Sequence, residues 1–235
     1  HWSRLAYDEL LAGQLALALV RTQMKRASGT SWKGDGSKQN IVRANLPYSL
    51  TGAQTRSIDE IQSDMRSGDR MLRLLQGDVG SGKTIVALMA CLAAVEAGGQ
   101  AAIMAPTEIL ARQHFATIAP LAEAAHVRIA VLTGRDKGKT REKIYAELES
   151  GEIDIIIGTH RLVGKDIKFK DLGLMIIDEE QKFGVSVKDK LKLMKVNVDT
   201  LTLTATPIPR TLQFSLMGAR DLSIINTPPP NRQPV

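Results

Sequence analysis

The feature that most constrains the fold is an octet that fits the phosphate-binding pattern G-x-x-x-x-G-K-[ST] without a mismatch. It consists of Gly77, Asp78, Val79, Gly80, Ser81, Gly82, Lys83 and Thr84. An apolar run that ends at Leu75 precedes it, and an apolar helical pattern from Ile85 to Leu92 follows it. Strand, glycine-rich loop and helix therefore come in the order that a phosphate cradle requires. We predict that this chain binds a nucleoside triphosphate.

Each part of the octet has a physical role in such a cradle. The glycines allow backbone N–H groups to turn inward, and the helix N-terminus adds roughly half a positive charge. Lys83 is expected to reach the β- and γ-phosphates, and the Thr84 hydroxyl to bind Mg²⁺. The alternative is a glycine-rich turn before a helix that carries Lys-Thr by chance. The agreement between motif and flanking pattern favours the phosphate site.

After the octet, apolar runs alternate with helical patterns. The predicted strands cover residues 100–105, 127–132, 154–158, 174–178, 200–204 and 222–225, and the predicted helices cover residues 51–67, 108–123, 139–149, 187–194 and 210–217. This alternation argues for a parallel sheet with helices on both faces. Continuous apolar runs such as 155–157 suit strands that are buried on both sides. The expected fold class is therefore α/β, a single doubly wound nucleotide-binding domain.

The two ends of the chain differ from this pattern. Residues 4–25 have leucines at helical spacing and predict a long amphipathic helix, whereas the polar stretch 27–45 predicts a flexible surface loop. Three prolines at 228–230 are expected to end the regular structure as a linker. Cys91 is the single cysteine, so it excludes an internal disulfide and is expected to pack as a small hydrophobic side chain.

Charge and hydropathy limit the kinds of binding partner that this chain is expected to have. A net charge of +6 suits a polyanionic partner, although a generally basic surface is the alternative. No apolar run has the length of a membrane span and no signal peptide is recognisable, so we expect a cytoplasmic protein without a membrane partner.

A pair of acids follows the buried strand predicted at 174–178. In open α/β sheets, ligands bind at the carboxyl ends of the strands. Asp178 is then placed to hold Mg²⁺, and Glu179 to orient or deprotonate the water that attacks the γ-phosphate. The alternative is an acidic turn, which the octet 100 residues upstream disfavours. Glu180 is expected to face solvent or to pair with a basic neighbour.

Small hydroxyl residues follow the next apolar strand. Thr204 and Thr206 are placed to sense the phosphate and to relay its loss to a neighbouring surface. Thr206 also fits a helix N-cap, with Pro207 at the first helical position, and both interpretations are compatible.

Seven ordered motifs together resemble the superfamily 2 helicases. They are Leu50-Thr51-x-Ala53-Gln54, GDVGSGKT at 77–84, APTEILA at 105–111, Thr133-Gly134, Gly158-Thr159-His160, DEEQ at 178–181 and TATPIPRT at 204–211. Residues 1–160 resemble RecG-type branch-migration helicases. The stretch from Phe169 onward is more similar to the translocase module of the transcription-repair coupling factor. A typical RecG would read DEQH at 178–181, which leaves open a divergent RecG, an intermediate lineage or a chimera.

The resemblance implies a RecA-like motor domain and roles for further residues. Gln54 would contact the adenine edge, and Tyr48 would stack on the base or else serve as a packing aromatic. Gln181, Thr204 and Thr206 would couple hydrolysis to movement. A further set, on loops after strands, would contact the phosphates of one DNA strand: Thr107, Arg112, Thr133, Gly134, Arg135, Thr159, His160 and Arg161. For His160, a structural histidine with its hydrogen bonds satisfied is the alternative. Such binding should weaken steeply with salt.

The resemblance also implies a domain organisation. We predict an N-terminal helix and flexible loop over residues 1–46, a RecA-like ATP-binding domain over 47–227, and a linker over 228–235. A second RecA-like domain would supply an arginine finger, worth about 10³–10⁵-fold in related phosphoryl transfer. Since the sequence stops at Val235, we expect one motor half, with weak ATP and DNA binding, almost no DNA-stimulated hydrolysis and no unwinding.

The function expected from the resemblance is that of an ATP- and Mg²⁺-dependent DNA helicase or translocase acting on stalled forks and branched DNA in recombination and repair. One alternative is the translocase domain of a transcription-repair coupling factor. Others are a non-motor nucleotide switch and a nucleic-acid-binding module that holds phosphate without turnover. RNA is a weaker choice of substrate because the acidic box of RNA helicases typically reads DEAD or DExH.

Overall fold

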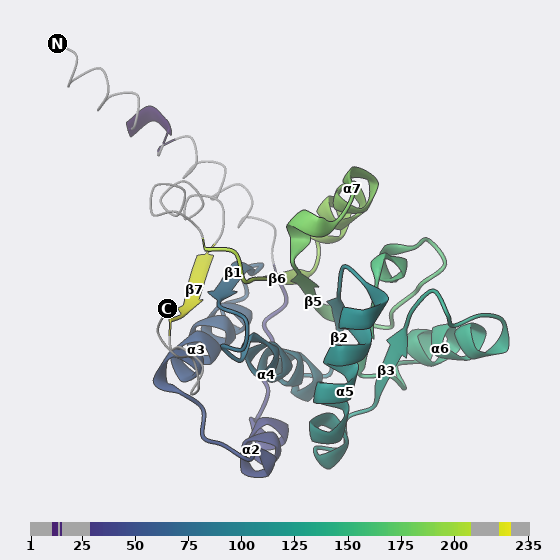
Figure 1. Ribbon diagram of the computed structural model, residues 1–235, viewed down its shortest axis with the longest axis horizontal. Coiled ribbons are helices and arrows are strands. Elements are labelled where there is room, and N and C mark those ends of the chain that lie inside the picture. The colour runs from purple at the N-terminus through teal and green to yellow at the C-terminus, as the bar shows by residue number, and fades with distance from the viewer. Residues whose placement is uncertain (1–10, 14, 16–28, 208–220, 227–235) are drawn as a thin grey trace.

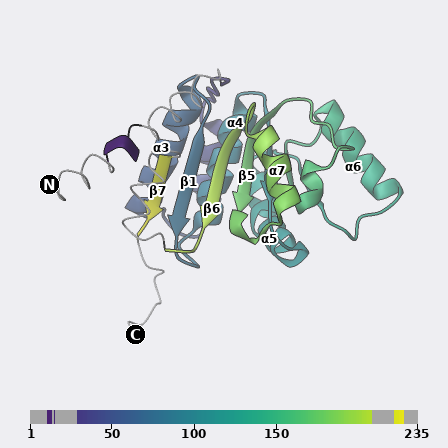
Figure 2. The same ribbon diagram turned by 90° about the horizontal axis from the view of Figure 1, so that it is seen from above.

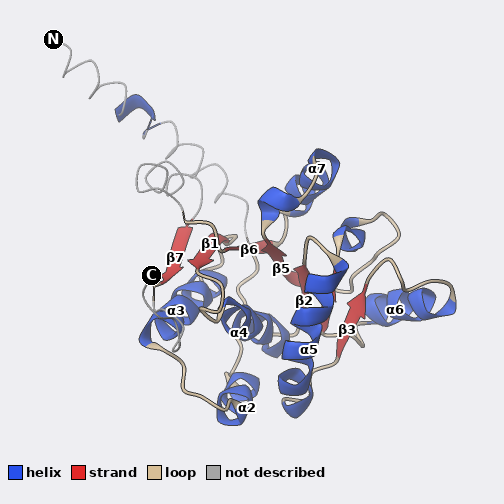
Figure 3. Ribbon diagram, in the orientation of Figure 1, coloured by secondary structure: helices blue, strands red, loops and turns tan. Residues whose placement is uncertain are grey.

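A parallel β-sheet organises the molecule in this computed structural model, which describes residues 11–13, 15, 29–207 and 221–226. Seven strands form the sheet within these residues (Figure 3). They are β1 (Leu72–Gly77), β2 (Gln100–Met104), β3 (Ile129–Leu132), β4 (Ile155–Gly158), β5 (Leu172–Asp178), β6 (Asp199–Thr204) and β7 (Asp221–Ile225). Their order is β3-β4-β2-β5-β6-β1-β7, and every pair is parallel. All predicted strands are confirmed, with ends that differ by at most two residues.

Helices connect the strands. They are α2 (Ser37–Asn45), α3 (Gly52–Arg66), α4 (Lys83–Glu96), α5 (Glu108–Ala124), α6 (Lys139–Ser150) and α7 (Val185–Met194). Two short 3₁₀ helices, η1 (His160–Val163) and η2 (Glu180–Lys182), follow β4 and β5. The structure confirms the predicted helices at 51–67, 108–123, 139–149 and 187–194. The helices predicted at 4–25 and 210–217 lie largely or wholly outside the described residues, as does the proline-rich segment 228–230.

The two faces of the sheet bury different helices (Figures 1 and 2). Because side chains alternate along a strand, Ala101 and Ile103 of β2 join the core beneath α3, α4 and α5. Ala102 and Met104 join the opposite core, to which α6, η1 and α7 contribute Leu148, Leu162 and Leu191, among others. Helix α4 is buried along most of its length, and Cys91 lies fully buried within it, as predicted. This is the doubly wound α/β arrangement that the sequence predicts.

The prediction of a flexible surface loop at 27–45 is wrong for residues 37–45, whereas residues 29–36 form no helix or strand. Trp32 is buried in the core, and residues 37–45 form helix α2, which packs on α4 and α5. The N-terminus of α2 is capped by a residue distant in sequence: Glu96 accepts hydrogen bonds from the backbone N–H groups of Gly36 (2.9 Å) and Gln39 (3.0 Å). The polar composition of the segment suggested a loop because neither the cap nor the core that receives Trp32 is local.

Among the described residues, no helix combines the length and the apolar character that crossing a membrane would require.

A buried acid at the start of β6 gives folding stability a pH dependence. Asp199 Oδ1 accepts a hydrogen bond from Met71 N (2.8 Å), whereas Oδ2 is buried without a hydrogen-bond partner. Burial, helped by the nearby charge of Asp64, raises the pKa of Asp199 to about 7, against the opposing effects of Met71 N and Arg70. The folded state therefore binds this proton more tightly than the unfolded state, so stability falls as pH rises from about 4 to about 7.

We expect Asp199→Asn to stabilise the protein by about 1–3 kcal/mol at pH 8 and by much less at pH 5, because the neutral amide removes the cost of a buried charge. Urea unfolding at the two pH values measures the difference. Asp189→Asn, at a mostly exposed site on α7, is the control and should be nearly neutral at both. A stability gain of equal size at pH 5 and pH 8 would contradict this interpretation of Asp199.

Candidate nucleotide-binding site

Three adjacent strands bring the predicted nucleotide-binding residues to one edge of the sheet. β1 ends in the glycine-rich octet, β5 ends at Asp178, and β6, which lies between them, ends at Thr204. Since all strands run parallel, these carboxyl ends meet at the same edge. Two sequence segments about 100 residues apart are thereby placed together.

The glycine-rich loop adopts a backbone that requires glycine. Gly80 (φ 80°) and Gly82 (φ 86°) are in the left-handed region, and Gly82 is the N-cap of α4. A Cβ atom at Gly82 would also lie 2.2 Å from Gln54 Nε2. The first turn of α4 follows directly, so its free backbone N–H groups point out of the helix end toward the space above the loop.

Gln54 connects helix α3 to this loop. Its Oε1 accepts from Thr51 N (2.9 Å) in a capping box, and its Nε2 donates to Ser81 O (2.9 Å). The amide thus fixes the position of the loop relative to α3. The predicted contact with the adenine edge stays a prediction.

Lys83 is folded back onto its own loop. Its Nζ donates to the carbonyl oxygens of Gly77 and Asp78. Burial lowers the pKa of Lys83, and the negative charges of Asp178, Glu179 and Asp78 oppose that shift. The ammonium group is therefore close enough to both predicted catalytic acids for their charges to act on it.

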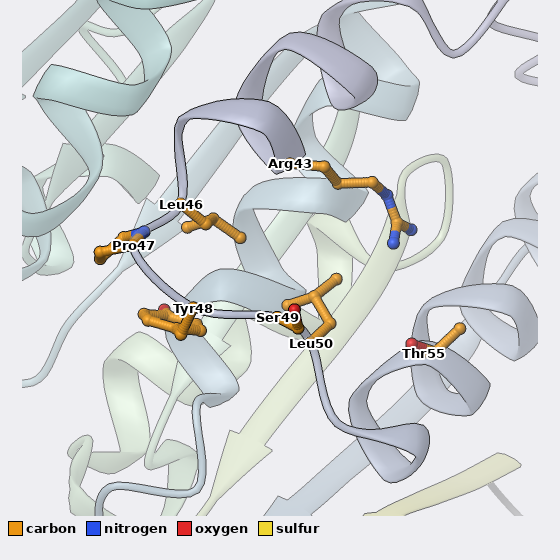
Figure 4. A pocket seen from close by; sticks show the side chains of 7 residues that line it. All are labelled: Arg43, Leu46, Pro47, Tyr48, Ser49, Leu50 and Thr55. Carbon is orange, nitrogen blue, oxygen red and sulfur yellow. The ribbon is translucent and has the colours of Figure 1, made fainter.

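Tyr48 borders the glycine-rich loop. It is 54% exposed, so it is not a core aromatic. With Gly80, Gly82 and Lys83 it lines a cavity of about 240 Å³ that extends to Thr117, Ile118 and Leu121 of α5. Another hollow, of about 470 Å³ and lined by Arg43, residues 46–50 and Thr55, has Tyr48 in its wall as well (Figure 4). A flat aromatic ring beside the phosphate loop is suitably placed to stack on a base.

Asp178 is held by a residue that the sequence reasoning missed. His114 Nε2 on α5 lies 2.9 Å from Asp178 Oδ2, and both side chains are largely buried. The two residues are 64 positions apart, and His114 lies in the middle of an ordinary helical pattern. No signal in a single sequence pairs them.

Glu179 is oriented by its backbone and by two neighbours. Its φ of 49° is in the left-handed region, and its N–H donates to Leu203 O (2.9 Å). Its Oε1 accepts from Ala205 N (2.7 Å), and its Oε2 accepts from Gln181 Nε2. A non-glycine residue in this region costs on the order of 1–3 kcal/mol, and such residues cluster at functional sites.

The threonine segment is joined directly to this acid. Ala205, which binds Glu179, lies between the two threonines predicted to sense phosphate, and Thr206 N donates to Thr204 Oγ1 (3.1 Å). The geometry thus links residues 204–206 to the predicted catalytic glutamate. The helix that Thr206 would cap lies outside the described residues. Glu180 forms an ion pair with Lys195 at the end of α7. Of the two alternatives predicted for Glu180, this is the pairing with a basic neighbour.

A second cluster forms where α5 meets the loop after β3. Arg112 donates to Thr133 Oγ1 (3.1 Å), and Thr133 N and Oγ1 both donate to Asp136. Glu108 accepts from Gly134 N (2.6 Å) and lies 3.5 Å from Arg135 Nε. Sequence reasoning missed Glu108 and Asp136, which shape this loop.

The remaining residues predicted to contact DNA lie beside this cluster. Arg161 follows β4 and approaches Gly134, and Thr107 caps α5 by accepting from Leu110 N (3.2 Å). His160 is exposed and Thr159 is buried, and the role of His160 stays a prediction. The loops after β2, β3 and β4 therefore form one surface next to the nucleotide-binding edge.

The residues present suit a nucleotide with Mg²⁺. Within the described residues, no group of three or more His, Cys, Asp or Glu side chains forms a metal cage. Mg²⁺ is usually held by one or two protein groups together with phosphates and waters, for which Thr84 and Asp178 suffice. Ser81 Oγ, inside the loop, is buried without a hydrogen-bond partner.

Comparisons with known proteins agree with this geometry. A family model described as DEAD/DEAH box helicase matches residues 51–214. Transcription-repair-coupling factors are 47% identical over 228 residues in Staphylococcus haemolyticus and 50% identical over 207 residues in Staphylococcus epidermidis. These matches cover 97% and 88% of this chain but only 19% and 18% of those proteins. A solved structure of RecG bound to a three-way DNA junction is 42% identical, with a TM-score of 0.81, over 99% of this chain and 31% of that one.

The fold and the site define a P-loop nucleotide-binding domain of the RecA-like type. The family match covers more than half of the sequence, and the chain belongs to the DEAD/DEAH box helicase family. It is a motor domain of the superfamily 2 helicases and translocases, as its resemblance to RecG and to the coupling factor predicted.

Proposed function

We propose that this chain is the first motor domain of an ATP-dependent DNA translocase that remodels stalled forks and branched DNA. The observation that carries the proposal is that the phosphate loop, Asp178 and Glu179 lie at one edge of the sheet. The loops that follow β2, β3 and β4 form a surface beside them. The matched relatives are described as a repair-coupling factor and as RecG bound to a three-way DNA junction.

The proposed nucleotide is ATP with Mg²⁺. Lys83 and the α4 N-terminus would bind the phosphates, and Thr84 and Asp178 would hold the metal, whose role is to neutralise charge on the phosphates. Glu179 would orient the attacking water, with its carboxylate held by Ala205 N. Tyr48 would stack on the base.

The proposed polymer is DNA, bound through its phosphates. Thr107, Arg112, Thr133, Gly134, Arg135, Thr159, His160 and Arg161 would provide hydroxyl, backbone N–H and cationic groups on adjacent loops. Such contacts position a strand without reading its sequence. Gln181, Thr204 and Thr206 would couple the state of the nucleotide to this surface through Glu179.

The chain spans about a fifth of the length of the curated relatives it matches and about a third of the RecG chain. We therefore propose that full turnover and unwinding require a second RecA-like domain, which would face the same sheet edge. Residues 1–46 and 228–235 would flank the motor domain, although Trp32 and α2 pack in its core.

Translocation without strand separation, within a transcription-repair coupling factor, is the second candidate. Identities of 47–50% to coupling factors make it compatible with the comparisons, as the 42% identity to RecG makes the first candidate. Both candidates share the ATP and DNA contacts, and they differ in the DNA structure that stimulates hydrolysis.

The test joins residues 1–235 to the second motor domain of a RecG and, separately, to that of a coupling factor. We expect DNA to stimulate ATP hydrolysis in at least one fusion, with binding that weakens steeply as salt rises. Stronger stimulation by branched DNA supports fork remodelling, and equal stimulation by linear duplex supports the coupling-factor role. If neither fusion binds ATP, the proposal is refuted.

A further inference from the structure

Helix α5 contacts three separate parts of the molecule. Near its start, Glu108 and Arg112 bind the loop that carries Thr133 and Gly134. Two turns from its start, His114 binds Asp178. Further along, Thr117, Ile118 and Leu121 line the cavity beside the phosphate loop. A single helix therefore joins the 133–136 loop to the acid proposed to hold magnesium.

The contact between His114 and Asp178 has a defined chemistry. A carboxylate only accepts hydrogen bonds, so Nε2 carries the proton and donates to Oδ2. The side chains are 13% and 11% exposed, so little water competes for this bond. In the described part of the chain, His114 supplies the one side-chain hydrogen bond to this carboxylate. The other oxygen, Oδ1, stays available.

We propose that His114 is a positioning residue that fixes the Asp178 carboxylate for magnesium. Its hydrogen bond to one oxygen restricts the rotation of the carboxylate. The other oxygen is therefore already oriented toward the metal before the metal binds. Carboxylates that bind metals are commonly held by such outer hydrogen bonds, and the loss of one typically costs about 10–100-fold in metal affinity or activity. This inference rests on the proposed binding of ATP with Mg²⁺.

Because His114 lies on α5, it connects Asp178 to the 133–136 loop, which binds the start of the same helix. A displacement of the 133–136 loop would be passed through Glu108 and Arg112 to α5, and through His114 to Asp178. Helix α5 would thus connect the residues proposed to bind DNA with the acid proposed to bind the metal. This connection is separate from the one that Ala205 N makes to Glu179.

The test uses the full chain and a fluorescent ATP analogue, with Mg²⁺ as the titrant. His114→Leu keeps similar bulk without a donor, and we expect it to need about 10–100-fold more Mg²⁺ than the parent chain for half-maximal enhancement of binding. Nucleotide affinity in EDTA should be unchanged. His114→Gln, which retains an N–H donor on a long side chain, should stay within a few-fold of the parent. Gln113→Leu, at the exposed neighbouring position, is the matched control.

His114→Asn has an amide on a shorter side chain, and it is expected to behave like the leucine variant. It keeps the test informative if leucine at this position prevents folding, which thermal unfolding would reveal. A normal Mg²⁺ midpoint in the folded leucine or asparagine variant overturns the inference. So does a glutamine variant as impaired as leucine, because the donor would then not matter. If the parent chain shows no Mg²⁺-dependent nucleotide binding, it is the proposed function that fails.

Discussion

Glu179→Gln is expected to reduce ATP hydrolysis by about 10²–10⁴-fold while leaving ATP binding nearly unchanged. Glutamine has the same shape and can still accept the hydrogen bond from Ala205 N, which the glutamate receives at 2.7 Å. It cannot take a proton from water, and general base catalysis typically contributes a factor of this size. Steady-state turnover of the chain joined to a second motor domain, together with nucleotide binding by the chain alone, measures both quantities.

The matched control for this substitution is Glu149→Gln on α6. The Glu149 side chain is 62% exposed and lies 3.8 Å from Lys168, so the same change of charge occurs far from the site. Turnover of the control should equal that of the parent. Retention of more than a tenth of parental turnover by Glu179→Gln would show that another group activates the water.

Lys83→Ala is expected to have the other large effect, on binding as well as turnover. Hydrogen bonds to charged groups contribute about 1.5–3 kcal/mol, which corresponds to about a 10–100-fold weaker affinity for ATP. Loss of a preorganised donor to transition-state charge should lower turnover by about 10²–10³-fold. Titration with a fluorescent ATP analogue and steady-state kinetics measure the two effects.

For the lysine, Lys143→Ala on α6 is the control, since its side chain is 75% exposed. It removes the same charge and should change neither quantity. Lys83 also binds Gly77 O and Asp78 O, so thermal unfolding must accompany the assay. Equal ATP affinity in a folded Lys83→Ala protein would mean that phosphate is bound elsewhere.

The sequence predicted most of the regular structure because its signals are local. Apolar runs such as 155–157 predicted buried strands, and the glycines at 80 and 82 predicted the turn into α4. Helix α2 was missed because its cap, Glu96, lies 57–60 residues away and its core contacts come from α4 and α5. A window of sequence contains neither.

In the candidate site, too, local motifs were predictable from the sequence, whereas contacts between distant residues were not. Motif spacing predicts that Lys83, Asp178 and Glu179 belong to one site. It gave no indication of His114, Glu108 or Asp136, whose roles depend on contacts between different strands and helices. The left-handed backbone of Glu179 was equally unpredictable, because it arises from the junction of β5, β6 and η2 rather than from residue type.

The strand order has a consequence for how such a domain diversifies. The proposed polymer contacts follow β2, β3 and β4 in one half of the sheet, the phosphate loop follows β1 in the other half, and β5 lies between the halves. Insertions or substitutions in the first half can change which nucleic-acid shape is preferred while the hydrolytic half keeps its sequence. Helix α5, whose His114 binds Asp178 at the end of β5, is the element through which such changes would still reach the hydrolytic half.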